Sequence, residues 1–177
     1  MKITRPISKQ PIPYHAKRVF KGKIFDVYQW EQELFNGSKA TFEKIKRLDT
    51  VEVVPIMDDG KILLIEQVQP GKDPVISVPG GRVDEGEDVF DAVKRELQEE
   101  TGYEAKDWQF FEAIQPVSKV EWVIYTFIAK GLTKVSDLKL DGGEKIKLLP
   151  VSFDEFVELV ISGKYADQDF TIKVFEA

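Results

Sequence analysis

The 177-residue chain contains no cysteine and a single histidine, His15. The absence of cysteine excludes disulfide bonds, thiolate catalysis and cysteine-ligated zinc, and it suits a reducing compartment, so we expect a cytoplasmic protein. The histidine lies in a proline-rich N-terminal stretch, where a Ser-His-Asp triad or a histidine-rich zinc site is a poor fit. Any catalysis must therefore depend on other side chains.

The chain also lacks long apolar runs and an excess of basic residues. No segment resembles the apolar region of a signal peptide, and none is long enough to span a bilayer. Its 25 Lys and Arg residues are outnumbered by 31 Asp and Glu residues, which gives a net charge of -6. We expect neither membrane nor nucleic-acid partners, because nucleic acids are bound mainly through clustered cations. The length and a hydrophobic content of 42% suit one globular unit.

Extended segments separated by turn signals dominate the pattern. Asn36-Gly37 joins two runs rich in β-branched and aromatic residues, residues 17–34 and 38–47, and predicts an N-terminal antiparallel β-hairpin. A second tight turn at Asp58-Asp59-Gly60 separates two further predicted strands. The predicted strands after the hairpin cover residues 50–57, 61–68, 75–78, 109–113, 120–129 and 145–149.

Helical spacing occurs in two places. Residues 88–101 form a predicted helix that Asp88 caps at the start and Gly102 ends. The second starts at Ser152, which forms a capping box with Glu155, and ends near Gly163. We also predict a short helix over residues 170–175, and a loosely tethered stretch over the first 13 residues.

Three glutamates, Glu96, Glu99 and Glu100, fall in one sector of the first predicted helix, beside its apolar face. Like charges at this spacing destabilise a helix mildly. A hard divalent cation, which accepts several carboxylate ligands, would relieve the repulsion. A solvated acidic face is the commoner explanation of Glu-rich helices, so the helix alone favours it over the metal site while leaving both open.

The segment "GGRVDEGEDVFDAVKRELQEETGY" extends this pattern upstream. Its fixed positions are Gly81, Glu87, Arg95-Glu96, Glu99-Glu100 and Gly102, with Leu97 at an aliphatic position. This spacing resembles the Nudix box of the Nudix hydrolases, and the one departure is Tyr103, where the box has an aliphatic residue. The resemblance implies an α+β fold, an α/β/α sandwich with a mixed β-sheet between helices. It adds a division into an N-terminal sheet segment, residues 1–47, and a catalytic domain, residues 48–177.

The resemblance also implies a site. Glu96, Glu99, Glu100 and the carbonyl oxygen of Gly80 would ligate Mg²⁺, for which Mn²⁺ substitutes, while Arg95 and Glu87 would hold the arrangement. The implied reaction is hydrolysis of a phosphoanhydride in a nucleoside diphosphate linked to another group. The general base may come from the box or from a distant loop, and Glu144 in "LDGGEKIKL" is a candidate beside an ordinary solvated turn residue. The expected catalytic residues are Glu99, Glu100, Glu144 and Arg95.

The whole chain resembles the ADP-ribose and nucleotide-sugar pyrophosphatase branch more loosely. Gln69 and Ser77 stand where that branch often has Arg and Glu, and Pro116 follows the box sooner than usual. A GDP-mannose-type substrate, or a non-catalytic binding or sensor role, therefore stays open. In this branch the N-terminal sheet builds a homodimer and lends aromatic residues to the partner's site. The expected substrate contacts are Gly81, Arg82, Pro116, Tyr28 and Trp30.

Overall fold

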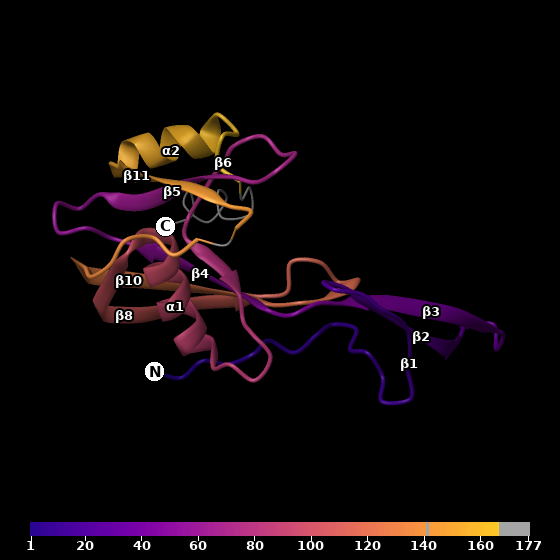
Figure 1. Ribbon diagram of the computed structural model, residues 1–177. Coiled ribbons are helices and arrows are strands. Elements are labelled where there is room, and N and C mark those ends of the chain that lie inside the picture. The colour runs from indigo at the N-terminus through magenta and orange to yellow at the C-terminus, as the bar shows by residue number, and fades with distance from the viewer. Residues whose placement is uncertain (141, 167–177) are drawn as a thin grey trace.

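A computed structural model describes residues 1–140 and 142–166 of the chain. Three sheets and two helices, α1 (Val89–Thr101) and α2 (Phe153–Ile161), make up its regular structure. α1 covers one side of the central sheet, and α2 lies over a second sheet on the other side (Figure 1). The arrangement is the predicted α+β fold, with mixed sheets between helices. No helix among the described residues is long and apolar enough to cross a membrane.

The central sheet carries the site. Its strand order is β7 (Gly80–Arg82), β4 (Thr50–Pro55), β10 (Ile124–Lys134) and β8 (Tyr103–Ile114). β4 and β10 are parallel and the other pairs antiparallel. Val93 and Leu97 of α1 are completely buried against this sheet, and burial of each such side chain is worth about 1.5–3 kcal/mol. This packing fixes which face of α1 remains available for its glutamates.

The other two sheets flank the central one. β11 (Lys145–Val151), β5 (Ile62–Val68) and β6 (Val75–Ser77) form an antiparallel sheet under α2. β1 (Lys17–Lys21), β2 (Asp26–Glu33), β3 (Lys39–Lys46) and the short β9 (Val120–Glu121) form the N-terminal sheet, which extends to one side of the molecule (Figure 1).

Local signals placed the helix ends correctly. Asp88 accepts a hydrogen bond from the Phe90 N–H at 2.8 Å, and Gly102 ends α1 with a φ of 75°. Ser152 and Glu155 form the predicted capping box at the start of α2. The helix predicted over residues 170–175 lies outside the described residues.

Two predicted strands are each divided in the structure. The run 17–34 turns back on itself, because the Gly22 N–H donates to the Phe25 carbonyl and closes a turn between β1 and β2. The run 120–129 breaks after Glu121, where the Val123 N–H donates to Asp49 and leads the chain from the N-terminal sheet into the central sheet. Both divisions depend on contacts that alternating hydrophobicity does not encode.

The first 13 residues are held, contrary to the prediction of a loose stretch. Ile3 packs against the central core, and Arg5 forms an ion pair with Asp49. The side chain of Lys44 is fully buried, and its ammonium group donates to Ser8 Oγ at 3.0 Å and to the Gln10 carbonyl at 2.6 Å. The prediction was wrong because these partners are distant in sequence from the segment that they hold.

Candidate active site

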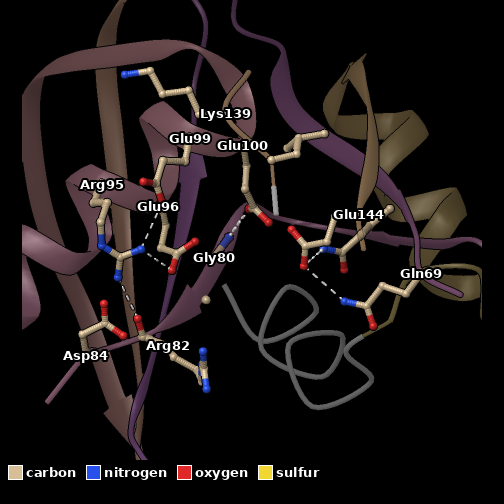
Figure 2. A pocket seen from close by; sticks show the side chains of 13 residues that line it. Gln69, Gly80, Arg82, Asp84, Arg95, Glu96, Glu99, Glu100, Lys139 and Glu144 are labelled. Carbon is tan, nitrogen blue, oxygen red and sulfur yellow. Dashed lines mark hydrogen bonds and ion pairs between the residues drawn. The ribbon is translucent and has the colours of Figure 1, made fainter. Parts of the chain in front are cut away.

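A cavity of about 490 Å³ lies where β7, α1, β5 and the segment before β11 meet. Figure 2 shows acidic side chains from α1 on one side of it and Glu144 on the other. The residues lining the cavity are Gln67, Gln69, Gly80, Gly81, Arg82, Asp84, Arg95, Glu96, Glu99, Glu100, Lys139, Leu140 and Glu144. The glycine, arginine and three glutamates of the predicted box thus share one cavity with the distant Glu144.

Arg95 is the centre of an ion-pair network at the edge of this cavity. Its Nε and Nη2 atoms donate to the two oxygens of Glu87, both at 2.9 Å. Nη1 donates to Glu96 at 2.8 Å and to Glu99 at 3.2 Å, and Nη2 also reaches the Arg82 carbonyl at 2.8 Å. The hydrogen bond from Arg95 lowers the pKa of Glu87, while Glu87 in turn raises the pKa of Arg95. The guanidinium therefore ties the loop before α1 to two glutamates of the helix.

Glu100 is the most deeply buried carboxylate of the site, with 5% of its surface exposed. Burial raises its pKa to about 8, although the Gly80 N–H, which donates to Glu100 Oε2 at 2.8 Å, favours the charged form. The neighbouring charges of Glu96, Glu144 and Glu99 raise the pKa further. A positive charge at this position would offset the cost of ionising Glu100.

Glu96 lies against the glycine-rich turn of β7. A Cβ atom placed on Gly81 would collide with the Glu96 carboxylate, so the close approach requires glycine. Burial raises the pKa of Glu96, and the hydrogen bond from Arg95 opposes that shift. The side chain of Glu99 is more exposed, at 39%, and faces the open side of the cavity.

Glu144 enters the cavity from the far side and is oriented by two amides. Gln67 and Gln69 donate to the same oxygen, Oε1, at 3.1 and 3.3 Å. The Gln69 amide is itself fixed, because its oxygen accepts a hydrogen bond from Lys72 Nζ at 2.9 Å and its nitrogen must then face Glu144. Glu144 is therefore positioned rather than a freely moving turn residue.

The donor set fits a hard divalent cation in its chemistry, since it consists of carboxylate oxygens and a backbone carbonyl. Among residues 1–140 and 142–166, no three carboxylates already converge as a ligand cluster. Arg95 holds Glu96 and Glu99, and the Gly80 N–H holds Glu100, so each of these carboxylates already has one oxygen engaged. Arg95 engages one oxygen of each of Glu96 and Glu99, so the second oxygen of each would be the one to reach a cation without loss of the ion pair.

The remaining predicted substrate contacts lie elsewhere in the single chain. Pro116 follows β8, and Tyr28 and Trp30 belong to β2; none of them lines the cavity. Trp30 is buried at 6% exposure and packs against Phe42 with ring centroids 6.3 Å apart. A role for β2 aromatics in a partner's site stays a prediction.

Sequence reasoning did not identify five cavity residues as part of the site: Gln67, Gln69, Asp84, Lys139 and Leu140. Gln67 follows Glu66 in the second half of β5, where four buried apolar residues give way to partly exposed ones, and this change is the local signal that marks it. Asp84 and Lys139 lie in irregular segments, where no periodicity marks them.

Comparisons with known proteins agree with this geometry. The model of the NUDIX domain matches residues 46–170. An ADP-ribose pyrophosphatase of Bacillus subtilis (strain 168) is 29% identical over 154 residues, which cover 85% of this chain and 83% of that protein. A methanol dehydrogenase activator of Bacillus methanolicus is 30% identical over 163 residues, or 90% and 88% of the two chains.

A solved crystal structure of an ADP compounds hydrolase superposes with a TM-score of 0.75, at 21% identity and 96% coverage of both chains. That likeness establishes the shared fold. Together with the match over residues 46–170 and the residues gathered around the cavity, it leads to one assignment: the chain belongs to the Nudix hydrolase family.

Proposed function

We propose that this chain hydrolyses the pyrophosphate bond of ADP-ribose or a related nucleoside diphosphate sugar, giving a nucleoside monophosphate and a sugar phosphate. The observation that carries the proposal is the gathering of Glu96, Glu99, Glu100 and Glu144 around one cavity beside the Gly80-Gly81 turn. The similarity to the ADP-ribose pyrophosphatase of Bacillus subtilis supports the choice of substrate class.

The reaction depends on Mg²⁺, with Mn²⁺ as a substitute. Glu96, Glu99, Glu100 and the Gly80 carbonyl would hold the cation. When bound, such a cation activates water and neutralises charge on the diphosphate. Arg95 supports the ligands, because its ion pair with Glu87 anchors the guanidinium that holds Glu96 and Glu99.

Glu144 is the proposed proton acceptor, with Glu99 and Glu100 as the other carboxylates of the catalytic group. The water oxygen forms a bond to one phosphorus, the bond between that phosphorus and the bridging oxygen breaks, and the water proton passes to a carboxylate. The amides of Gln67 and Gln69 engage only Oε1 of Glu144, which leaves Oε2 to receive the proton. Gly81 and Arg82 border the cavity and are the proposed diphosphate contacts.

The N-terminal segment, residues 1–47, is proposed to form a homodimer in which Tyr28 and Trp30 contribute to the partner's substrate site. Pro116 is a proposed substrate contact from the catalytic segment, residues 48–177. Several apolar side chains of β1 and the following turn are exposed, including Phe20 at 58% and Phe25 at 43%. Light scattering at micromolar concentration should give twice the monomer mass of 20.2 kDa, and a monomer would refute this part of the proposal. The proposed location of the protein is the cytoplasm.

The test uses ADP-ribose, GDP-mannose and UDP-glucose, each with Mg²⁺ or with EDTA. Chromatography of the products should reveal a nucleoside monophosphate and a sugar phosphate only in the presence of Mg²⁺. Glu100→Gln should lower turnover about 100-fold or more while its circular dichroism spectrum stays unchanged. Near-normal turnover in that variant would contradict the proposed site.

If the protein hydrolyses GDP-mannose faster than ADP-ribose in the same panel, then GDP-mannose is the substrate in place of ADP-ribose. A non-catalytic nucleotide-sugar binding role is the second candidate, and the 30% identity to a protein named as an activator favours including it. Binding of a nucleotide sugar by calorimetry, with no product after prolonged incubation with Mg²⁺, would establish the binding role instead.

A further inference from the structure

The chain leaves β5 through a tight turn made of Gln69, Pro70, Gly71 and Lys72. The Lys72 N–H donates to the Gln69 carbonyl at 3.1 Å, and Gly71 has a φ of 76°. Proline followed by a glycine of positive φ is typical of a type II β-turn, because proline presets the first central residue and glycine adopts the second without strain. The turn therefore brings Gln69 and Lys72, its first and last residues, together.

The side chains of these two residues are hydrogen-bonded to each other. Lys72 Nζ donates to Gln69 Oε1 at 2.9 Å, and Gln69 Nε2 donates to Glu144 Oε1 at 3.3 Å (Figure 2). An ammonium group only donates and an ionised carboxylate only accepts, so a single orientation of the amide satisfies both partners. Lys72 is connected to Glu144 through that one amide.

Strand register explains why the Gln69 amide depends on the turn. Val68, the last residue of β5, pairs with Lys145, the first residue of β11, so Gln69 and Glu144 lie just beyond the end of the ladder. Gln67 lies within the ladder, and it faces the same side as Gln69 because side chains alternate along a strand. The strand positions Gln67, whereas Gln69 follows the strand and is held by the turn and by Lys72.

We propose that Lys72 is a positioning residue for Glu144. Its ammonium group holds the Gln69 amide, the amide holds Glu144 Oε1, and Oε2 stays available for the proton of the attacking water. Lys72 is exposed and does not line the cavity, so it acts only through Gln69. This rests on the proposed function, in which Glu144 accepts the proton, and adds a residue outside the cavity on which turnover depends.

The kinetic test compares two exposed lysines at the same end of the sheet. Lys72→Met should lower kcat with ADP-ribose about 3- to 10-fold, the range for loss of one hydrogen bond, and change KM less than about twofold. Lys145→Met removes the same charge next to Glu144 but no contact with Gln69, and should change kcat less than about twofold. Lys72→Arg keeps a donor and should restore kcat.

A double-mutant cycle shows whether Lys72 acts through Glu144. In Glu144→Gln the carboxylate that Lys72 positions is gone, so adding Lys72→Met should cause no further loss of kcat. Equal urea midpoints for wild type and Lys72→Met would separate this effect from a change in stability.

A second measurement needs neither metal nor turnover. The side-chain amide signal of Gln69 in a proton–nitrogen correlation spectrum recorded in EDTA is assigned by its loss in Gln69→Met. A hydrogen bond to a carboxylate moves an amide proton downfield. Lys72→Met should therefore shift this signal toward the position of a free amide, and Lys145→Met should leave it in place.

An unchanged Gln69 signal or an unchanged kcat in Lys72→Met would overturn the positioning role, and so would equal effects of Lys72→Met and Lys145→Met, which would report a general effect of charge. Hydrolysis by wild type together with any of these results leaves the proposed function standing. If wild type hydrolyses none of the substrates with Mg²⁺, the proposed function is refuted, and the Gln69 signal in the two lysine variants still decides whether Lys72 holds the amide on Glu144.

Discussion

Replacing Glu100 by Gln should stabilise the metal-free protein at alkaline pH. The pKa of Glu100 is raised from 4.5 to about 8 in the folded chain, because burial penalises the charged carboxylate. A folded state that binds a proton more tightly than the unfolded state is favoured while the proton is present. The contribution of Glu100 to stability is therefore complete below the unfolded pKa and is lost as pH rises through the folded pKa.

The change in the free energy of unfolding follows from the raised pKa of Glu100. Each pH unit between the two pKa values changes the free energy of unfolding by about 1.36 kcal/mol, so wild type should lose roughly 4 kcal/mol relative to Glu100→Gln between pH 5 and pH 8. Gln retains an oxygen that accepts the hydrogen bond from the Gly80 N–H but carries no charge to desolvate.

Urea unfolding in EDTA, followed by tryptophan fluorescence at several pH values, measures the difference between the two proteins. Glu85→Gln is the control, because Glu85 is an exposed carboxylate in the loop before α1. Adding Mg²⁺ at pH 8 should restore wild-type stability and leave Glu100→Gln unchanged, since the variant lacks the charge that the cation compensates. A stability difference that stays flat from pH 5 to pH 8 would refute the reasoning.

Three further changes test other parts of the structure. Gly81→Ala should lower kcat/KM and Mg²⁺ affinity about 10-fold or more by displacing the Glu96 carboxylate, whereas Gly142→Ala, which meets no atom within 4 Å, should leave both unchanged in assays with ADP-ribose. Lys44→Met should cost about 3–5 kcal/mol in urea unfolding, because it removes the buried ammonium group that pairs with Glu121 and holds Ser8 and Gln10, and a loss below about 1 kcal/mol would contradict this role of Lys44. Arg95→Lys should destabilise the fold by about 1–3 kcal/mol near neutral pH, since lysine cannot reproduce the two-pronged pair, and this loss should shrink in acid.

Local chemistry explains what could be predicted about the site. The helix bounds, the Asp88 cap and the grouping of three glutamates on one helix face depend on neighbours within a few residues, and the structure reproduces them. The close contact between Gly81 and the Glu96 carboxylate, by contrast, joins two segments and was not predicted.

Contacts between distant segments decided the rest. The sequence by itself determined the family motif, the two helices and the alternation of strands and turns, because hydrophobic period and capping are short-range properties. Only the tertiary structure decided that Lys44 is buried under the N-terminal segment, that Glu144 shares a cavity with the box glutamates, and that Arg47 stacks on Trp122. Each of these depends on charges and hydrogen-bond partners that are brought together across sheets, and no pattern along one segment records which distant partner will neutralise a buried charge.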